Sequence, residues 1–234
     1  MAGTGLELGS ASLGGLAKTS LREQALDQLR NAVTSGEIQP GSRLIETELS
    51  AALGISRGTL REALRQLQQE GLVEAGERGR LTVRTLSDQE ILDMFAVRAA
   101  LEGLAAFIVS GRTDHGPLIA QLQAALDALE AARGSIKQMV EIDLNFHRLL
   151  CELTGNTTLL RTWEALAGSI RMSIMFSGTD KAVTNMSVPR HQKLIDAIAT
   201  GDPDVARAAV DTHMAEAAQN LLARDRSPDD VRTA

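Results

Sequence analysis

Apolar residues recur at helical spacing in three segments between residues 20 and 85, and two shorter apolar segments follow them. Ser20 and Glu23 form a capping box at the start of the first segment. Glycines follow each of the three segments, and a final hairpin after a tight helix–turn–helix is typical of a winged helix-turn-helix. The sequence therefore predicts such a domain over residues 20–85, with helices at 21–35, 46–53 and 57–70 and strands at 72–74 and 81–83.

Beyond Thr85 the pattern is helical throughout. Ser87 and Glu90 form a second capping box, and Asp202 precedes a proline at a first helical position. Six antiparallel helices are predicted, at 88–111, 116–132, 135–154, 157–176, 188–200 and 203–224. The expected fold class is mainly α: an N-terminal winged helix-turn-helix followed by an all-α antiparallel helical bundle over residues 86–226. We expect residues 1–19, which are rich in glycine, to be a disordered arm and residues 227–234 to be a polar tail.

Composition excludes several classes of protein. Hydrophobic residues make up 44% and charged residues 23% of the 234 residues, so wholesale disorder is excluded. Aromatic residues are only 2%, too few for a platform that stacks single-stranded nucleic acid. The single cysteine, Cys151, cannot form an internal disulfide or a cysteine zinc cluster and is expected to be a buried, inert thiol. Neither a signal peptide nor an apolar run of about 18 residues occurs, so we expect a cytoplasmic protein without a membrane span.

The net charge of −6 is unevenly placed along the chain. Residues 1–85 carry ten basic and ten acidic residues, whereas residues 86–234 carry fourteen and twenty. The acidity of the whole chain therefore does not argue against nucleic-acid binding by the first domain.

Arginines line one face of the third predicted helix. Arg57, Arg61 and Arg65 recur every four residues, opposite the leucines. An arginine early in a recognition helix can pair with guanine, and the cap at Ser56 leaves backbone N–H groups for a phosphate. The spacing alone is equally typical of a solvated face, but the hairpin with its basic tip around Arg78 favours DNA binding.

Two runs in this domain carry a family resemblance. They are Gly36-Glu37-Ile38-Gln39-Pro40-Gly41-Ser42-Arg43-Leu44, and the segment 45–73 with Leu53-Gly54-Ile55-Ser56-Arg57 and Leu60-Arg61-Glu62-Ala63-Leu64. Residues 20–84 closely resemble the GntR family of bacterial transcription regulators. The resemblance implies double-stranded operator DNA as partner and contacts from Arg43, Ser56, Arg57, Thr59, Arg61 and Gly79, to which the wing-tip Arg78 is added. Gly58 and Thr59 depart from the family's usual hydroxyl residue and proline, so operator preference is expected to differ.

Polar residues interrupt the apolar stripes of the second half. Asp143 and His147 are four residues apart and point to the same side of one helix, while His191 and His213 lie among apolar residues of two others. Burying these groups costs several kcal/mol unless they share a partner. A divalent transition metal (Zn²⁺, Ni²⁺ or Mn²⁺) is one such partner, and separately satisfied core histidines are the alternative.

Two arginines add to this set. Arg98 lies on the apolar stripe of the first bundle helix together with Glu102, so it is either paired internally or available to an anion. Arg171 also lies in a helix that otherwise faces inward, with weaker support.

The second half also resembles a known domain. The pairs Arg98 with Leu101-Glu102, Asp143 with Phe146-His147, and His191 with Leu194-Ile195, followed by His213, are similar to the FCD effector domain of the FadR subfamily, in a VanR-like six-helix form. The resemblance implies a metal site of Asp143, His147, His191 and His213 beside a pocket for a small carboxylate effector. Arg98 would bind that effector, and Arg171 is a second candidate on the ground of its inward-facing helix.

We therefore expect a metabolite-responsive transcription regulator that acts as a homodimer and is not an enzyme. A homodimer is expected because one short helix reads only a few base pairs, and a two-fold dimer doubles that readout. The alternatives are a metal sensor whose ion is itself the signal and, less favoured, a metal-dependent hydrolase.

Overall fold

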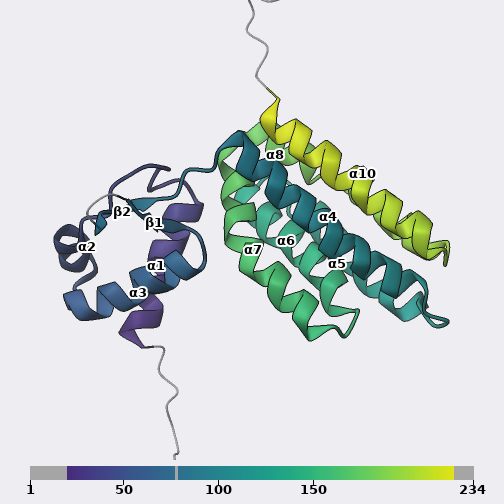
Figure 1. Ribbon diagram of the computed structural model, residues 1–234, viewed down its shortest axis with the longest axis horizontal. Coiled ribbons are helices and arrows are strands. Elements are labelled where there is room, and N and C mark those ends of the chain that lie inside the picture. The colour runs from purple at the N-terminus through teal and green to yellow at the C-terminus, as the bar shows by residue number, and fades with distance from the viewer. Residues whose placement is uncertain (1–19, 77–78, 224–234) are drawn as a thin grey trace, which may run out of the picture.

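The computed structural model describes residues 20–76 and 79–223. The predicted arm (1–19), the tail (227–234) and Arg78 lie outside the described residues. In Figure 1 a small N-terminal domain, which contains the only strands in the described part, lies beside a larger bundle of helices.

The N-terminal domain has the predicted winged-helix order. The predicted caps are confirmed: Ser20 and Glu23 bond reciprocally, and the Ser56 hydroxyl accepts from the Thr59 amide. Gly54 ends the second helix at φ 64°, a left-handed conformation that favours glycine. The elements are α1 (Leu21–Thr34), α2 (Glu46–Leu53), α3 (Arg57–Gln69) and an antiparallel hairpin of β1 (Val73–Ala75) and β2 (Leu81–Val83).

The bundle contains seven helices among the described residues, so the expectation of six was wrong. They are α4 (Asp88–Ser110), α5 (Gly116–Ala131), α6 (Ile136–Glu152), α7 (Thr157–Phe176), α8 (Thr179–Asn185), α9 (Val188–Ala199) and α10 (Pro203–Leu222). The unpredicted helix, α8, has seven residues and begins at Gly178 without a side-chain cap. So short a segment has neither an apolar period nor a start signal.

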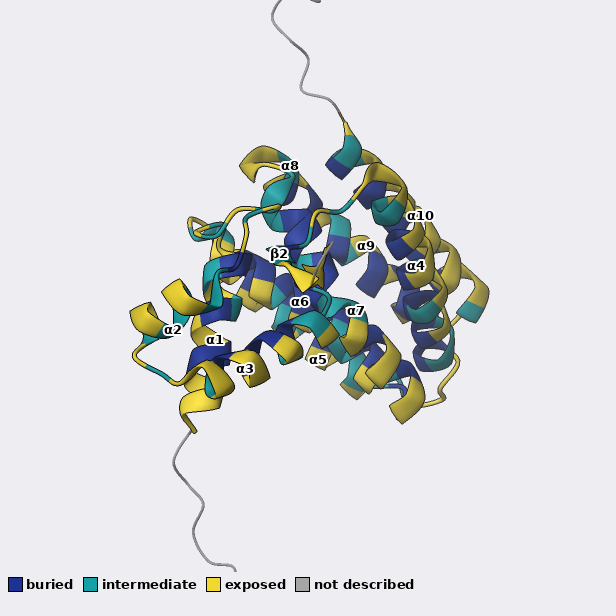
Figure 2. Cartoon of the chain, turned by 60° about the vertical axis from the view of Figure 1, so that its left-hand side comes forward, coloured by how far each residue is buried: buried dark blue, intermediate teal, exposed yellow. Residues whose placement is uncertain are grey.

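Each domain has its own hydrophobic core (Figure 2). The leucines of α3 that face inward, Leu60, Leu64 and Leu67, are fully buried, whereas the arginines on its other side are exposed. One residue of the bundle, Met172 of α7, is buried in the core of the N-terminal domain. The two domains therefore meet at α7. None of the described helices combines the length and apolar composition that crossing a membrane requires.

Candidate nucleic-acid interface and metal centre

Helix α3 presents its arginines to solvent. Arg57, at its first turn, makes no ion pair with any residue the structure describes, and Arg61 pairs through Nε with Glu46 Oε2 of α2 at 2.8 Å. Arg65 pairs with Glu62 within α3. The Ser56 hydroxyl is used in the cap, and Thr59 Oγ1 lies 2.9 Å from it. Arg57 and Arg61 are therefore exposed at the start of α3, where a recognition helix meets base edges.

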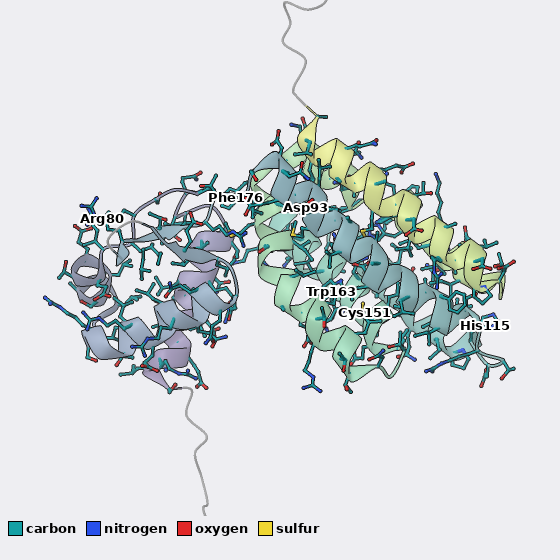
Figure 3. All side chains as sticks on the ribbon, viewed as in Figure 1. Arg80, Asp93, His115, Cys151, Trp163 and Phe176 are labelled. Carbon is teal, nitrogen blue, oxygen red and sulfur yellow. The ribbon has the colours of Figure 1, made fainter. Side chains whose placement is uncertain are left out.

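The wing extends this surface. Arg43 forms a β-bridge with Thr82, and the Leu44 amide donates to the Leu81 carbonyl at 2.8 Å, which places Arg43 beside the hairpin. Gly79 has φ 70° and an open surface around it, so a backbone can approach closely there. Arg80 is exposed at the outer end of the domain (Figure 3).

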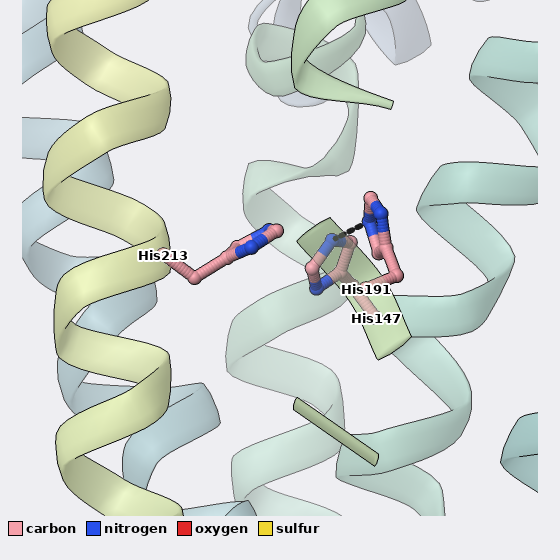
Figure 4. A group of neighbouring side chains, drawn as sticks. All are labelled: His147, His191 and His213. Carbon is pink, nitrogen blue, oxygen red and sulfur yellow. Dashed lines mark hydrogen bonds between the residues drawn. The ribbon is translucent and has the colours of Figure 1, made fainter. Parts of the chain in front are cut away.

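The three histidines singled out in the sequence converge inside the bundle. His147 of α6, His191 of α9 and His213 of α10 are buried, and each offers a ring nitrogen within 4.8 Å of the others (Figure 4). The Nε2 atoms of His147 and His191 are 3.2 Å apart, and Asp143 Oδ1 lies 3.0 Å from His191 Nε2. Asp143 is buried too, so the whole predicted set is brought together.

Hydrogen bonds on the far sides of the rings fix their orientation. His147 Nδ1 donates to Glu102 Oε2 at 2.6 Å, and His191 Nδ1 donates to the Ser187 carbonyl at 3.1 Å. With the protons on Nδ1, the Nε2 atoms of both rings face each other and the Asp143 carboxylate, an arrangement that needs either a shared proton or a metal ion between them. His213 Nδ1 is buried without a hydrogen-bond partner among the described residues. These features fit a divalent metal, whose histidine ligands ordinarily donate their other N–H to a carboxylate or carbonyl.

The ionisation of these side chains also suits a metal. Burial, followed by the fields of His191 and His147, holds the pKa of His213 well below its usual range, so its imidazole is neutral and able to ligate. Burial alone would raise the pKa of Asp143, but its bond to His191 and the neighbouring positive charges lower it, so Asp143 is a carboxylate. A neutral imidazole and a carboxylate are ligand types that suit Zn²⁺, Ni²⁺ or Mn²⁺.

Arg98 and Glu102 form a buried ion pair beside the histidines. Arg98 Nε donates to Glu102 Oε1 at 3.0 Å, and the indole N–H of Trp163 donates to the same oxygen at 2.7 Å. Burial opposes ionisation of Glu102, but Arg98, His147 and Trp163 outweigh it and lower its pKa to about 2. Arg98 Nη2 has no partner among the described residues. The internal pairing of Arg98 is therefore confirmed, and binding of an anion by its Nη2 stays a prediction.

A cavity of about 10 Å³ lies between these groups. Two residues that bond to Glu102 or line the cavity were not predicted from the sequence. Trp163 is the single tryptophan of the chain and lies fully buried on α7, but the sequence did not predict it as part of the site. Asn185, which belongs to the unpredicted α8, donates to the Ala217 carbonyl. The cavity is lined by Phe95, Arg98, Asp143, His147, Ile174, Asn185, His213 and Ala217.

Two other residues lie apart from this cluster. Arg171 forms a bidentate ion pair with Glu141 of α6, in which both N–O distances are 2.7 Å. The structure therefore does not bring Arg171 to the histidines. Because α7 also contacts the N-terminal domain, helical periodicity could not show whether Arg171 faces a ligand pocket or that domain. Cys151 is buried, and burial raises the pKa of its thiol, in keeping with an inert side chain.

Comparison with known families settles the class of protein. Residues 93–216 match the model of the FCD domain, and residues 21–83 match that of the bacterial regulatory proteins of the gntR family. The chain belongs to the GntR family. This regulator is 27% identical to a probable D-xylose utilization operon transcriptional repressor of Paenarthrobacter nicotinovorans, over 86% of this chain and 88% of the relative. It is 28% identical to a putative L-lactate dehydrogenase operon regulatory protein of Escherichia coli, over 83% of each chain.

Solved structures share the fold of this GntR-family regulator. A putative GntR regulator from Rhodococcus superimposes with a TM-score of 0.73 at 22% identity, covering 88% of this chain and 99% of the other. The E. coli protein McbR/YncC gives 0.68, also at 22% identity, covering 87% and 98%. The families and relatives are transcription regulators, so the chain is not an enzyme and the hydrolase alternative is discarded.

Proposed function

We propose that this GntR-family regulator acts as a homodimer whose affinity for operator DNA is set by a metal-centred ligand site in its FCD domain. One observation carries the proposal: ring nitrogens of His147, His191 and His213, from three helices, lie within 4.8 Å of one another in the buried interior of the bundle, and Asp143 Oδ1 lies 3.0 Å from His191 Nε2. A divalent metal held by these residues would supply a charge that neutralises the donor set and a Lewis-acid position for a ligand oxygen. Four protein ligands leave positions open on an octahedral ion.

A small carboxylate is the effector best suited to these positions. Its carboxylate oxygens can complete the coordination shell, while the unpaired Nη2 of Arg98 donates a charge-assisted hydrogen bond to it. The relatives named for D-xylose utilization and L-lactate dehydrogenase operons favour a small metabolite as signal.

A metal sensor is the second candidate. The cavity beside the histidines, about 10 Å³, has room for an ion or one water and not for a metabolite. If the ion itself is the signal, adding metal to the metal-free protein changes operator affinity without any organic ligand. If a metabolite is the signal, metal is required but a carboxylate must be added for the change.

The test uses the untagged full-length chain prepared without chelators. Elemental analysis is expected to find one divalent transition metal per chain, and sequencing of the genomic fragments that the protein retains provides the operator. Operator titrations then compare metal-free protein, metal-loaded protein, and metal-loaded protein with added small carboxylates. A chain that takes up no stoichiometric metal contradicts the proposal and leaves the cluster as a polar core.

Substitution of the arginines of α3 is expected to weaken operator binding. Arg57→Ala and Arg61→Ala should each lose about 1–3 kcal/mol, a factor of roughly 5 to 150, if they read bases. Arg65→Ala is the matched control, because it lies on the same face but further from the start of α3 and pairs with Glu62. Titration at constant salt measures the effect. Unchanged affinity in both variants, with folding intact, contradicts the assignment.

The dimer is expected to use the apolar outer stripe of α4. Val97 and Leu104 are 45% and 40% exposed and seven residues apart, so they share one face with the exposed Ala100 between them. Leu104→Glu is therefore expected to give a monomer at micromolar concentration by light scattering. Leu92→Glu is the control, because Leu92 is equally exposed (41%) but lies about 140° around the helix from Val97. A dimeric Leu104→Glu protein would place the interface elsewhere.

A further inference from the structure

Helix α7 takes part in both hydrophobic cores. It packs in the bundle core from Trp163, which is 1% exposed, to Ile174, while Met172 is 2% exposed and belongs to the core of the N-terminal domain. Figure 3 shows Trp163 within the bundle and Phe176 at the junction of the two domains. Within the described residues, no other bundle helix contributes to the N-terminal core.

At the bundle end, Trp163 of α7 is hydrogen-bonded to Glu102, which also accepts a hydrogen bond from the candidate metal ligand His147. The Trp163 indole donates to Glu102 Oε1 at 2.7 Å, and the other oxygen of that carboxylate accepts from His147 at 2.6 Å. All three side chains are buried, so this chain of bonds has no competing water. If His147 moves, these bonds therefore either resist the movement or move Trp163 with it.

At the junction, α7 touches the end of α3 directly. A Cβ placed on Gly168 would lie 2.5 Å from the Glu70 carbonyl oxygen and 3.3 Å from Leu72 Cδ2, so only glycine allows this approach. Glu70 is the C-terminal cap of α3, and its side chain is held by Arg30 of α1 through two bonds of 2.8 and 2.9 Å. The end of α3 is thus clamped between α1 and α7.

We propose that α7 transmits the state of the metal centre to the DNA-reading helix, with Trp163 as the positioning residue at one end and Gly168 as the contact at the other. The inference rests on the proposed metal function and adds a route to it. The route is five residues long, which is less than two turns of helix. A shift of α7 along its axis would move the end of α3 relative to the bundle and so change how the two recognition helices of a dimer are spaced.

The experiment follows the two ends of the route separately, with Zn²⁺ alone as the probe. Trp163 is the single tryptophan, so its fluorescence reports on the bundle end, and hydrogen–deuterium exchange of the amides at 66–73 reports on the end of α3. In the wild-type chain, Zn²⁺ is expected to shift the fluorescence and to change the exchange rates at 66–73 at least twofold. Elemental analysis of every sample measures bound metal independently.

Two variants test the two ends of the route separately, and a third variant is the control. Trp163→Phe keeps an aromatic ring but removes the donor to Glu102, so it should retain Zn²⁺ while the response at 66–73 is lost. Gly168→Ala should keep the fluorescence response but lose the exchange response, because its methyl group forces α3 away. Gly116→Ala is the control, since a Cβ on this α5 glycine meets nothing within 4 Å, and both responses should persist.

The outcomes separate the route from the metal site. A wild-type chain that binds no Zn²⁺ contradicts the proposed function and the route together. A wild-type chain that binds Zn²⁺ without any response at 66–73, or a Gly168→Ala chain that responds like the wild type, overturns the route alone. If Trp163→Phe fails to fold or to bind Zn²⁺, Gly168→Ala decides the question.

Discussion

Glu102→Ala is expected to destabilise the metal-free protein by about 3–5 kcal/mol, a large share of the stability of an ordinary domain. Glu102 is fully buried, and Arg98 beside it is 2% exposed. Removing the carboxylate leaves the guanidinium as an uncompensated buried charge and also leaves the Trp163 indole and His147 Nδ1 without their acceptor. Urea unfolding followed by circular dichroism in the presence of a chelator measures the loss.

Glu141→Ala is the matched control. Glu141 also pairs with an arginine, Arg171, through two short bonds, but its side chain is 50% exposed. An exposed pair contributes about 0–1 kcal/mol because water screens both charges. Equal losses for the two variants would mean that Glu102 is not the charge that keeps Arg98 in the core.

The locally encoded parts of the structure could be predicted from the sequence. Caps such as Ser20, Ser56 and Ser87 bond to amides three residues away, so their partners are visible in the sequence itself. Helical periodicity likewise indicated that His147, His191 and His213 face inward. Periodicity shows which side of a helix faces inward but not which residues lie opposite it. The family resemblance was needed to predict that the histidines of the three helices lie close together.

The contacts between distant residues could not be predicted in this way. The bond between Trp163 and Glu102 joins positions 61 residues apart, and the pair of Arg171 with Glu141 joins positions 30 apart. An inward arginine can meet a ligand, a carboxylate or another domain. Arg98 and Arg171 look alike in sequence and both pair with a carboxylate, but only Arg98 is buried beside the histidines. Helix α8 could not be predicted because seven residues without a side-chain cap carry no periodic signal. Asn185, which lies on α8, could not be predicted for the same reason.

The double variant His147→Ala/His213→Ala is expected to lose the metal completely. Two of the four proposed ligands, one from α6 and one from α10, are removed, and the remaining Asp143 and His191 cannot hold an ion alone. A ligand that binds only the folded state stabilises it by about 4 kcal/mol at a thousand times its Kd. Added Zn²⁺ should therefore raise the midpoint of thermal unfolding of the wild-type chain by several degrees and leave that of the double variant unchanged.

His115→Ala is the control for this prediction, because His115 lies in the exposed turn before α5, where its Nδ1 bonds to the Arg112 carbonyl. It should retain one metal per chain and the full thermal response. Arg98→Ala should also retain the metal, since its guanidinium contacts Glu102 and not the ligand nitrogens, but should weaken the response to any carboxylate effector. Stoichiometric metal in the double variant would show that the ion binds elsewhere and that the histidine cluster is a polar core, with its lone pairs separated by a shared proton in place of a metal.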